Sequence, residues 1–248
     1  MNYALIFAGG AGVRMNSPTI PKQFLEIHGK PILIHTILDF ENHEDIDGIV
    51  VSCLEGWEDH LRKLIDLERI KKVKWIVRGG TTGQLSIFNG LKAVYDQCDS
   101  PKETIMLIHD GVRPLLTPRE IGDCISSTRQ FDASLGVVSA NEKVFVTDVN
   151  GKIEGFPPPE RCVLSRSPTG VFLSNIMEAH LKAQADGLIN FLTTTDLLMY
   201  YGFPVYTYEC SRENIKITSP VDYYTFRSIL DAKENAMYAP YGKEATDS

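Results

Sequence analysis

The sequence predicts an α/β protein with a Rossmann-like, doubly wound and mainly parallel sheet, from which a β-arm projects. Short apolar runs alternate with longer amphipathic runs through the first 139 residues, which is typical of strands joined by crossover helices. An Asn150-Gly151 turn and three consecutive prolines then interrupt the alternation. That interruption indicates a projecting hairpin instead of another crossover.

Five apolar runs are rich in β-branched residues, as expected for strands covered on both faces. They span residues 3–7, 49–53, 73–77, 104–109 and 133–139. The amphipathic runs predict helices over residues 32–40, 57–66, 84–96, 118–129, 174–184, 195–201 and 221–236. The fourth of these has a clear start, because Thr117 is a good N-cap and Pro118 suits the first helical position. We expect one domain over residues 1–236, with its β-arm at about 140–165, and a polar C-terminal tail over 237–248 that frays.

Composition narrows the classes of partner. The 248 residues contain 25 Lys and Arg against 32 Asp and Glu, a net charge of −7. This charge argues against broad binding to nucleic acid or to an anionic membrane, but not against a small anion held by a few local cations. No apolar stretch approaches the ~20 residues that span a bilayer. The five cysteines are widely spaced and form no Cys-x-x-Cys pair, which favours a reducing compartment and a cytoplasmic location.

The first predicted strand runs into a glycine-rich loop, Ala8-Gly9-Gly10-Ala11-Gly12-Val13-Arg14-Met15. Glycines at the carboxyl end of a first parallel strand let backbone N–H groups approach phosphates. Met15 occupies the third glycine position of the dinucleotide fingerprint, and no Gly-Lys-Ser/Thr ends the loop. The glycines alone therefore leave a phosphate site and a turn without a ligand equally open.

Two cations, Arg14 and Lys22, bracket this loop in a way that suits a triphosphate. Lys22 lies in the string Pro21-Lys22-Gln23-Phe24, which is followed by Gly29-Lys30-Pro31-Ile32-Leu33. The glycine loop and these two strings together resemble the sugar- and polyol-phosphate nucleotidyltransferases. Within that superfamily they are similar to the cytidylyltransferases that act on 2-C-methyl-D-erythritol 4-phosphate or on ribitol 5-phosphate.

The resemblance continues in order over about residues 1–235. Its further motifs are Arg78-Gly79-Gly80 with Ser86-Ile87, His109-Asp110-Gly111-Val112-Arg113-Pro114, Arg161 with Ser167-Pro168, Thr195-Asp196 and Asn214-Ile215-Lys216-Ile217-Thr218. It implies CTP-dependent transfer of CMP to a polyol phosphate, with Mg²⁺ and with release of pyrophosphate. Ribitol 5-phosphate is the favoured acceptor, and a 2-C-methyl-D-erythritol 4-phosphate cytidylyltransferase of isoprenoid synthesis is the alternative. The resemblance also implies a homodimer through the β-arm, with Arg161 reaching the substrate of the neighbouring subunit.

The resemblance assigns site residues as follows. The catalytic cations are Arg14, Lys22 and Lys216. The nucleotide contacts are Phe7, Ala8, Gly9, Gly10, Ala11, Gly12, Gly80, Gly83, Gln84 and Ser86. The acceptor contacts are Asp110, Arg113, Arg161, Ser167 and Thr195.

The residues themselves support several of these roles. Asp110 follows an apolar strand, so it belongs at the strand's carboxyl end, where it could bind a divalent metal or substrate hydroxyls. Arg113 could hold an acceptor phosphate or pair with Asp110. Lys216 lies between β-branched residues in a strand-like run, an unfavourable place for a charge unless an anion meets it. We expect His109 to be structural and not a general base.

Three departures from the family pattern keep a second alternative open. Gly83 stands where the family has an arginine, and Gln84 is the neighbouring residue that could partly substitute. Thr169 replaces the glutamine of the Thr-Pro-Gln motif, and Lys143-Val144 replaces an Asp-Thr pair of the arm. Gly83 in place of the arginine motivates the second alternative, a nucleotide-binding protein with impaired catalysis, whereas the departures together leave the identity of the acceptor open. A nicotinamide-dependent oxidoreductase would explain only the glycine loop and none of the later motifs.

Overall fold

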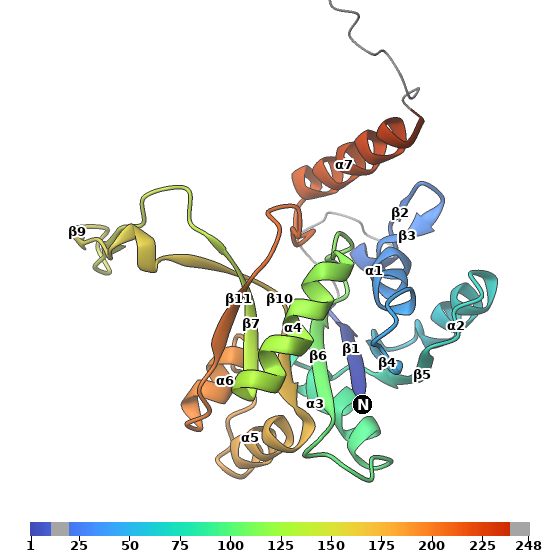
Figure 1. Ribbon diagram of the computed structural model, residues 1–248, viewed down its shortest axis with the longest axis horizontal. Helices are drawn as coiled ribbons and strands as arrows, with labels where there is room; N and C mark the ends of the chain where they lie inside the picture. Colours follow the sequence, from blue (N-terminus) through green and yellow to red (C-terminus); the bar gives the residue numbers. More distant parts are fainter. Residues whose placement is uncertain (11–19, 239–248) are drawn as a thin grey trace, which may run out of the picture.

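The computed structural model describes residues 1–10 and 20–238, built around one central seven-stranded sheet (Figure 1). The strands lie in the order β11-β7-β10-β6-β1-β4-β5. Their bounds are β1 (Asn2–Ala8), β4 (Gly48–Cys53), β5 (Val73–Arg78), β6 (Ile105–Asp110), β7 (Ala133–Ser139), β10 (Val163–Phe172) and β11 (Tyr206–Glu209). Only β10 runs antiparallel to its two neighbours. The mainly parallel, doubly wound sheet that the sequence predicts is therefore confirmed.

The predicted helices all form, with ends within two residues of those expected. They are α1 (Ile32–Glu41), α2 (Glu58–Leu67), α3 (Gly83–Tyr95), α4 (Pro118–Phe131), α5 (Leu173–Ala185), α6 (Thr194–Tyr200) and α7 (Pro220–Tyr238). Thr117 and Glu120 form a reciprocal capping box at the start of α4, as its sequence predicts. Within the described part of the chain, no helix is long and apolar enough to cross a membrane.

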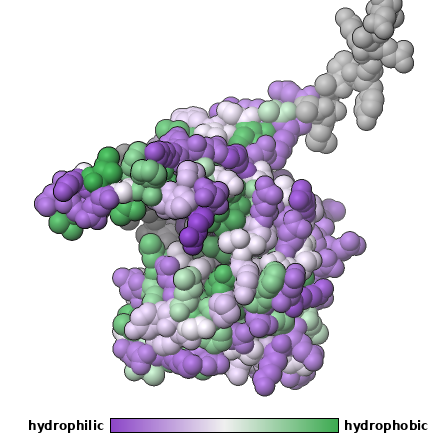
Figure 2. All heavy atoms as spheres, turned by 60° about the vertical axis from the view of Figure 1, so that its left-hand side comes forward, coloured by the Kyte–Doolittle hydropathy of each residue, from purple (hydrophilic) through white to green (hydrophobic). Residues whose placement is uncertain are grey.

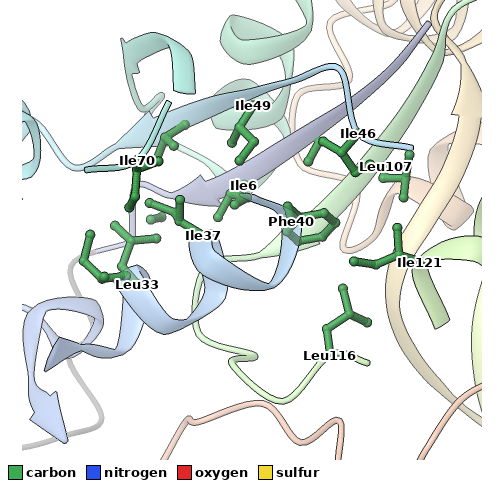
Figure 3. Close-up of a cluster of buried hydrophobic side chains, with 14 of the residues drawn as sticks. Ile6, Leu33, Ile37, Phe40, Ile46, Ile49, Ile70, Leu107, Leu116 and Ile121 are labelled. Carbon is green, nitrogen blue, oxygen red and sulfur yellow. The ribbon is translucent and has the colours of Figure 1, made fainter. Parts of the chain in front are cut away.

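Strand β1 divides the core into two layers because its side chains alternate between the faces of the sheet. Ala4 and Ile6 face one cluster of buried side chains, to which α1, α2 and α4 contribute. Leu5 faces the other cluster, which includes side chains of α3, α5 and α6. Figure 3 shows the first cluster, in which Leu33 and Phe40 of α1 point toward the strands. Helices thus cover both faces of the sheet.

The strand order reverses beside β1. The chain passes from β1 to β4 and β5 on one side, and then returns to place β6 on the other side. In parallel sheets of this kind, ligands bind in the crevice at the carboxyl ends of the two strands that flank the reversal. The crevice is therefore expected beyond Ala8 and Asp110, where the glycine loop and the predicted acidic residue lie.

The β-arm leaves the body of the protein between β7 and β10 and projects well beyond it (Figure 1). Two short strands pair antiparallel within it, β8 (Val146–Thr147) and β9 (Ile153–Gly155), and the 3-10 helix η3 (Pro159–Arg161) follows. The backbone N–H of Ala140 donates to the carbonyl of Cys162 at 3.1 Å and closes the base of the arm.

Several elements differ from the expectations. Strands β10 and β11, the small hairpin of β2 (Glu26–Ile27) and β3 (Lys30–Pro31), and the 3-10 helix η2 (Lys22–Phe24) were not predicted. The interpretation of the run around Lys216 as strand-like is wrong, because residues 214–218 form an irregular segment before α7. Ile217 nevertheless packs in a third buried cluster with Phe226 of α7. Of the predicted tail, only residues 237–238 are described, as the end of α7, and the single-domain division stays a prediction.

Candidate active site

Two adjoining cavities open at the carboxyl ends of β1 and β6, and four residues line both of them: Phe7, Gly83, Asp110 and Lys216. The first cavity, of about 370 Å³, is lined by the ends of the two glycine loops and by Lys22, and is here named the loop cavity. The second, of about 350 Å³, lies against β10 and α6 and is here named the α6 cavity. The site therefore has two compartments that meet at Asp110 and Lys216.

The loop cavity depends on close contact between two glycine backbones. A Cβ atom on Gly9 would lie 3.2 Å from Cα of Gly79 and 2.8 Å from Oγ of Ser86. Only glycine permits this approach. Gln23 fixes the same loop, since its side-chain amide donates to the carbonyls of Ala8 at 2.8 Å and Gly10 at 3.2 Å. Gln23 is fully buried, and sequence reasoning named it only as part of a motif.

The second glycine loop is held by Ser86 and Thr82. Ser86 Oγ accepts from the N–H of Gly80 at 3.0 Å and donates to the carbonyl of Thr82 at 2.9 Å. Thr82 caps α3. Gln84 lines the α6 cavity, but its amide is committed to Leu188 O and to the N–H of Phe191, at 2.9 and 2.8 Å. The side chain of Gln84 thus braces a loop, and its nucleotide contact stays a prediction.

Two described cations, Lys22 and Lys216, line the loop cavity. Lys22, in η2, lines this cavity, and its Nζ lies 3.4 Å from the carbonyl oxygen of Ile217. Lys216 lines both cavities. Three further predicted site residues, Ala11, Gly12 and Arg14, lie outside the described residues. Lys22 and Lys216 thus bring two positive charges to the loop cavity, which suits the phosphates of a nucleotide.

Asp110 is the last residue of β6 and forms two ion pairs at the junction of the cavities. Its Oδ1 lies 2.6 Å from Nζ of Lys216, and its Oδ2 accepts from Nε of Arg113 at 2.9 Å. Burial alone would raise the pKa of this carboxyl, but the charges of Lys216 and Arg113 outweigh burial and hold the pKa below its ordinary value. Of the two roles left open for Arg113, pairing with Asp110 is the one formed here.

His109 and Ser167 form a buried pair behind Asp110. The Nε2 of His109 lies 3.0 Å from the carbonyl oxygen of Arg113, and Nδ1 lies 2.9 Å from Oγ of Ser167. A carbonyl can only accept, so Nε2 carries the proton and the Ser167 hydroxyl donates to Nδ1. Burial lowers the pKa of His109 to about 4. His109 is therefore a neutral structural residue, as expected, and Ser167 faces the α6 cavity with acceptor capacity only.

Asn214 connects these groups, although it was named only as part of a motif. Its side-chain Nδ2 donates to the carbonyl of Ser167 at 2.7 Å, and its backbone carbonyl accepts from Arg113 at 2.8 Å. The side chain is fully buried. The sequence signal for Asn214 is its place at the start of the string Asn214-Ile215-Lys216-Ile217-Thr218, and its burial is compatible with these hydrogen bonds.

Two predicted acceptor contacts lie in different places. Thr195 lines the α6 cavity, and its Oγ1 is shielded from solvent and has no hydrogen-bond partner. Arg161 is exposed in η3, at the base of the arm, and lines neither cavity. A single subunit therefore leaves Arg161 outside its own site.

The chemistry of the donors does not fit a resident metal centre. Among the described residues, no three His, Cys, Asp or Glu side chains cluster closely enough to hold a metal ion. Both oxygens of Asp110, the predicted metal ligand, are engaged by cations. A metal ion at Asp110 would have to share the carboxylate with the charges of Lys216 and Arg113.

The chain matches a family model, curated relatives and solved structures over most of its length. The family model of 2-C-methyl-D-erythritol 4-phosphate cytidylyltransferase (IspD) matches residues 3–232. Ribitol-5-phosphate cytidylyltransferases of Streptococcus agalactiae serotype III and Vibrio parahaemolyticus are 40% and 39% identical to the chain over 235 residues, covering 95% of it and 98% of each relative. A 2-C-methyl-D-erythritol 4-phosphate cytidylyltransferase of Clostridium botulinum is 38% identical over 232 residues, covering 93% and 97%. The solved 4-diphosphocytidyl-2C-methyl-D-erythritol synthase of Anaerococcus prevotii shares the fold, with a TM-score of 0.80 at 24% identity over 93% of this chain and 96% of that one.

Proposed function

Because this chain belongs to the 2-C-methyl-D-erythritol 4-phosphate cytidylyltransferase family and is a cytidylyltransferase, we propose that it joins CMP from CTP to ribitol 5-phosphate. The observation that carries this proposal is the meeting of the loop cavity and the α6 cavity at Asp110 and Lys216. A nucleotide and a phosphorylated acceptor need two adjoining compartments with cations at their junction. Ribitol 5-phosphate is preferred because relatives from Streptococcus and Vibrio that bear its name match almost the whole chain.

In the proposed reaction, the glycine loops hold the triphosphate of CTP and the α6 cavity holds the acceptor. An oxygen of the acceptor's phosphate attacks the α-phosphorus and forms a new P–O bond. The bond from the α-phosphorus to the bridging oxygen breaks, and pyrophosphate leaves with the electron pair. Lys22, Lys216 and Arg14 would neutralise charge around the reacting phosphorus, so that catalysis is positioning plus electrostatic stabilisation.

We propose that Mg²⁺ arrives with CTP as part of the substrate. A magnesium ion commonly keeps several waters and binds substrate phosphate oxygens with few protein ligands. The engagement of Asp110 by Lys216 and Arg113 supports this view over a preformed protein site.

The acceptor is tested by measuring pyrophosphate release with CTP and either ribitol 5-phosphate or 2-C-methyl-D-erythritol 4-phosphate. We expect a higher kcat/KM for ribitol 5-phosphate, and a preference for the methylerythritol compound would reverse the assignment. The alternative of a protein with impaired catalysis rests on Gly83, where an added Cβ would meet nothing within 4 Å. Calorimetric CTP binding without pyrophosphate release for any polyol or sugar phosphate would favour that alternative.

We also propose a cytoplasmic homodimer formed through the β-arm. The arm exposes large apolar side chains, including Phe145, Val149, Ile153 and Phe156, and Figure 2 shows green, hydrophobic areas on the projecting arm. Exposed apolar surface of this kind indicates a covering partner, and a second copy would also give the exposed Arg161 a site to enter. All five cysteines are free, which is consistent with a reducing compartment.

Sedimentation velocity tests the dimer. The wild type should sediment as a dimer, and the double variant Phe145→Asp/Phe156→Asp should sediment as a monomer while it keeps CTP binding. Arg161→Ala should remain dimeric but lose acceptor affinity. A monomeric wild type would contradict the proposal.

A further inference from the structure

Arg166 occupies an irregular part of β10 beside the α6 cavity. The pairing of β10 with β7 shifts register between Ser165 and Thr169, and such irregularities redirect side chains from the regular ladder. Arg166 lines the α6 cavity together with Ser165 and Ser167, but it does not line the loop cavity. Its positive charge is therefore close to the α6 cavity and not to the loop cavity.

The guanidinium of Arg166 has no carboxylate partner within the described residues, in contrast to its neighbours. Arg113 and Lys216, the other cations of the α6 cavity, both pair with Asp110. Among residues 1–10 and 20–238, the only acceptor for Arg166 is the carbonyl of Ser165, at 3.0 Å, and its Nε is shielded from solvent without a partner there. A shielded donor on a charged group is unfavourable unless something accepts from it.

The surroundings of Arg166 also favour an anion. Burial lowers the pKa of its guanidinium, and the positive charge of Arg113 lowers it further; Cys210 raises it, and Arg212 has the smallest, lowering effect. A dianionic ligand would relieve this like-charge repulsion. The planar fork of an arginine suits a phosphate in particular, because two of its N–H groups can donate to two phosphate oxygens.

Other unpartnered polar atoms of the α6 cavity suit a ligand with hydroxyl groups. Thr195 Oγ1 has no partner, and neither ring nitrogen of His180 has one, although His180 is only 1% exposed. Burial lowers the pKa of His180 to about 4, so its ring is neutral and can exchange hydrogen bonds with hydroxyls. These unpartnered groups and Arg166 line the same cavity.

We propose that Arg166 binds the phosphate group of the acceptor, a phosphorylated polyol, and so determines the enzyme's affinity for that substrate. The inference rests on the proposed function, because it assumes that the α6 cavity takes the acceptor. It assigns Arg166 no part in binding CTP, whose phosphates are expected in the loop cavity.

The test compares Arg166→Gln with wild type, using calorimetry and steady-state kinetics with ribitol 5-phosphate. Loss of one charged hydrogen-bonding group should raise the acceptor's Kd and KM about 10- to 100-fold. The Kd and KM for CTP should stay within about twofold of wild type, which also shows that the variant is folded. Arg166→Lys should recover part of the loss, since it keeps the charge without the fork.

Arg212→Gln is the matched control, because Arg212 is a nearby exposed cation that lines neither cavity. We expect its acceptor KM within about twofold of wild type, since the substitution removes a nearby charge but no residue that lines the α6 cavity. An unchanged acceptor Kd in Arg166→Gln, or an equal loss in Arg212→Gln, would overturn the inference. If the wild type binds ribitol 5-phosphate without turnover, and Arg166→Gln weakens that binding, the result would contradict the proposed function and support the inference. Absence of wild-type binding for every polyol phosphate would overturn both.

Discussion

Nζ of Lys216 lies 2.6 Å from Oδ1 of Asp110, where the loop cavity and the α6 cavity meet. Lys216 comes from an irregular segment close to the C-terminal helix, and Asp110 comes from the end of a central strand. The ion pair therefore fastens that segment to the sheet and sets the charge at the reacting centre. Asp110 is 8% exposed, so removal of its partner leaves a nearly buried carboxylate with Arg113 alone.

We predict that Lys216→Met makes the protein more sensitive to acid. The folded-state pKa of Asp110 lies below its ordinary value, so its ion pairs stabilise the fold above the ordinary pKa of about 3.9. That stability is lost as the pH falls through the depressed pKa. Without Lys216, only Arg113 opposes the effect of burial, which raises the pKa of Asp110. The midpoint of acid unfolding should therefore move to higher pH.

The midpoint is measured by circular dichroism between pH 2 and 6, where Lys216→Arg should behave nearly as wild type. Lys233→Met is a control at an exposed lysine that pairs with Glu213. Superimposable curves for Lys216→Met and wild type would contradict the energetic role assigned to the pair.

Lys22→Ala should lower kcat by about 10²–10³-fold while the fold stays intact, because it removes one preorganised contact to the developing charge. Lys92→Ala provides a control, since Lys92 pairs with Asp96 on α3 and lines neither cavity. Pyrophosphate release at saturating CTP measures the effect. Near-normal turnover of the Lys22 variant would remove Lys22 from the catalytic residues.

Gly9→Ala should impair stability and CTP binding together. The added Cβ would meet Cα of Gly79 at 3.2 Å and Oγ of Ser86 at 2.8 Å, and overpacking of this kind costs about 1–3 kcal/mol. Gly122→Ala in α4 is the control, because its Cβ would meet nothing within 4 Å and alanine favours a helix by up to about 1 kcal/mol. In urea unfolding, the free energy of unfolding should fall for Gly9→Ala and rise for Gly122→Ala. Equal changes in the two variants would show that the loop tolerates a side chain.

His28 should make stability depend on pH near neutrality. Its Nδ1 lies 2.9 Å from Glu234 and its Nε2 lies 2.8 Å from Asp231, and hydrogen bonds to these carboxylates raise its pKa, Glu234 contributing most. The stabilisation is present below the ordinary pKa of about 6.5 and is lost as the pH rises through the raised value. The Tm difference between wild type and His28→Asn should thus be larger at pH 5.5 than at pH 9.

The same comparison in an Asp231→Asn/Glu234→Gln background isolates the interaction. There, His28→Asn should change Tm equally at both pH values. A pH-dependent difference that survives in this background would assign the effect to another group.

Much of the fold was predictable because local patterns and tertiary structure agree. Buried apolar runs such as residues 49–53 and the Thr117 cap identify their elements without reference to the rest of the chain. Strand β10 was missed because Ser167-Pro168 and several polar residues interrupt its hydrophobic pattern. Lys216 was misassigned because β-branched neighbours also suit an irregular segment whose alternate residues, such as Ile217, are buried under α7.

The candidate site was predictable where motifs follow strands, and less so where distant segments converge. Asp110 and the glycine loop are placed by the carboxyl ends of β6 and β1. No local pattern indicates that Arg113 and Lys216 share the carboxylate of Asp110. Nor does one indicate that the amide of Gln84 bonds to Leu188, or that Arg166 lines the α6 cavity without a carboxylate partner among the described residues. Those relationships depend on long-range packing, which a single sequence does not specify.

The most direct test of the account is ³¹P NMR of the wild-type protein incubated with CTP, Mg²⁺ and ribitol 5-phosphate. We predict two new diphosphate signals for a CDP-polyol, growing in step with inorganic pyrophosphate and only when both substrates are present. Release of inorganic phosphate instead, or persistence of the two starting spectra when CTP is bound, would contradict cytidylyl transfer to this acceptor.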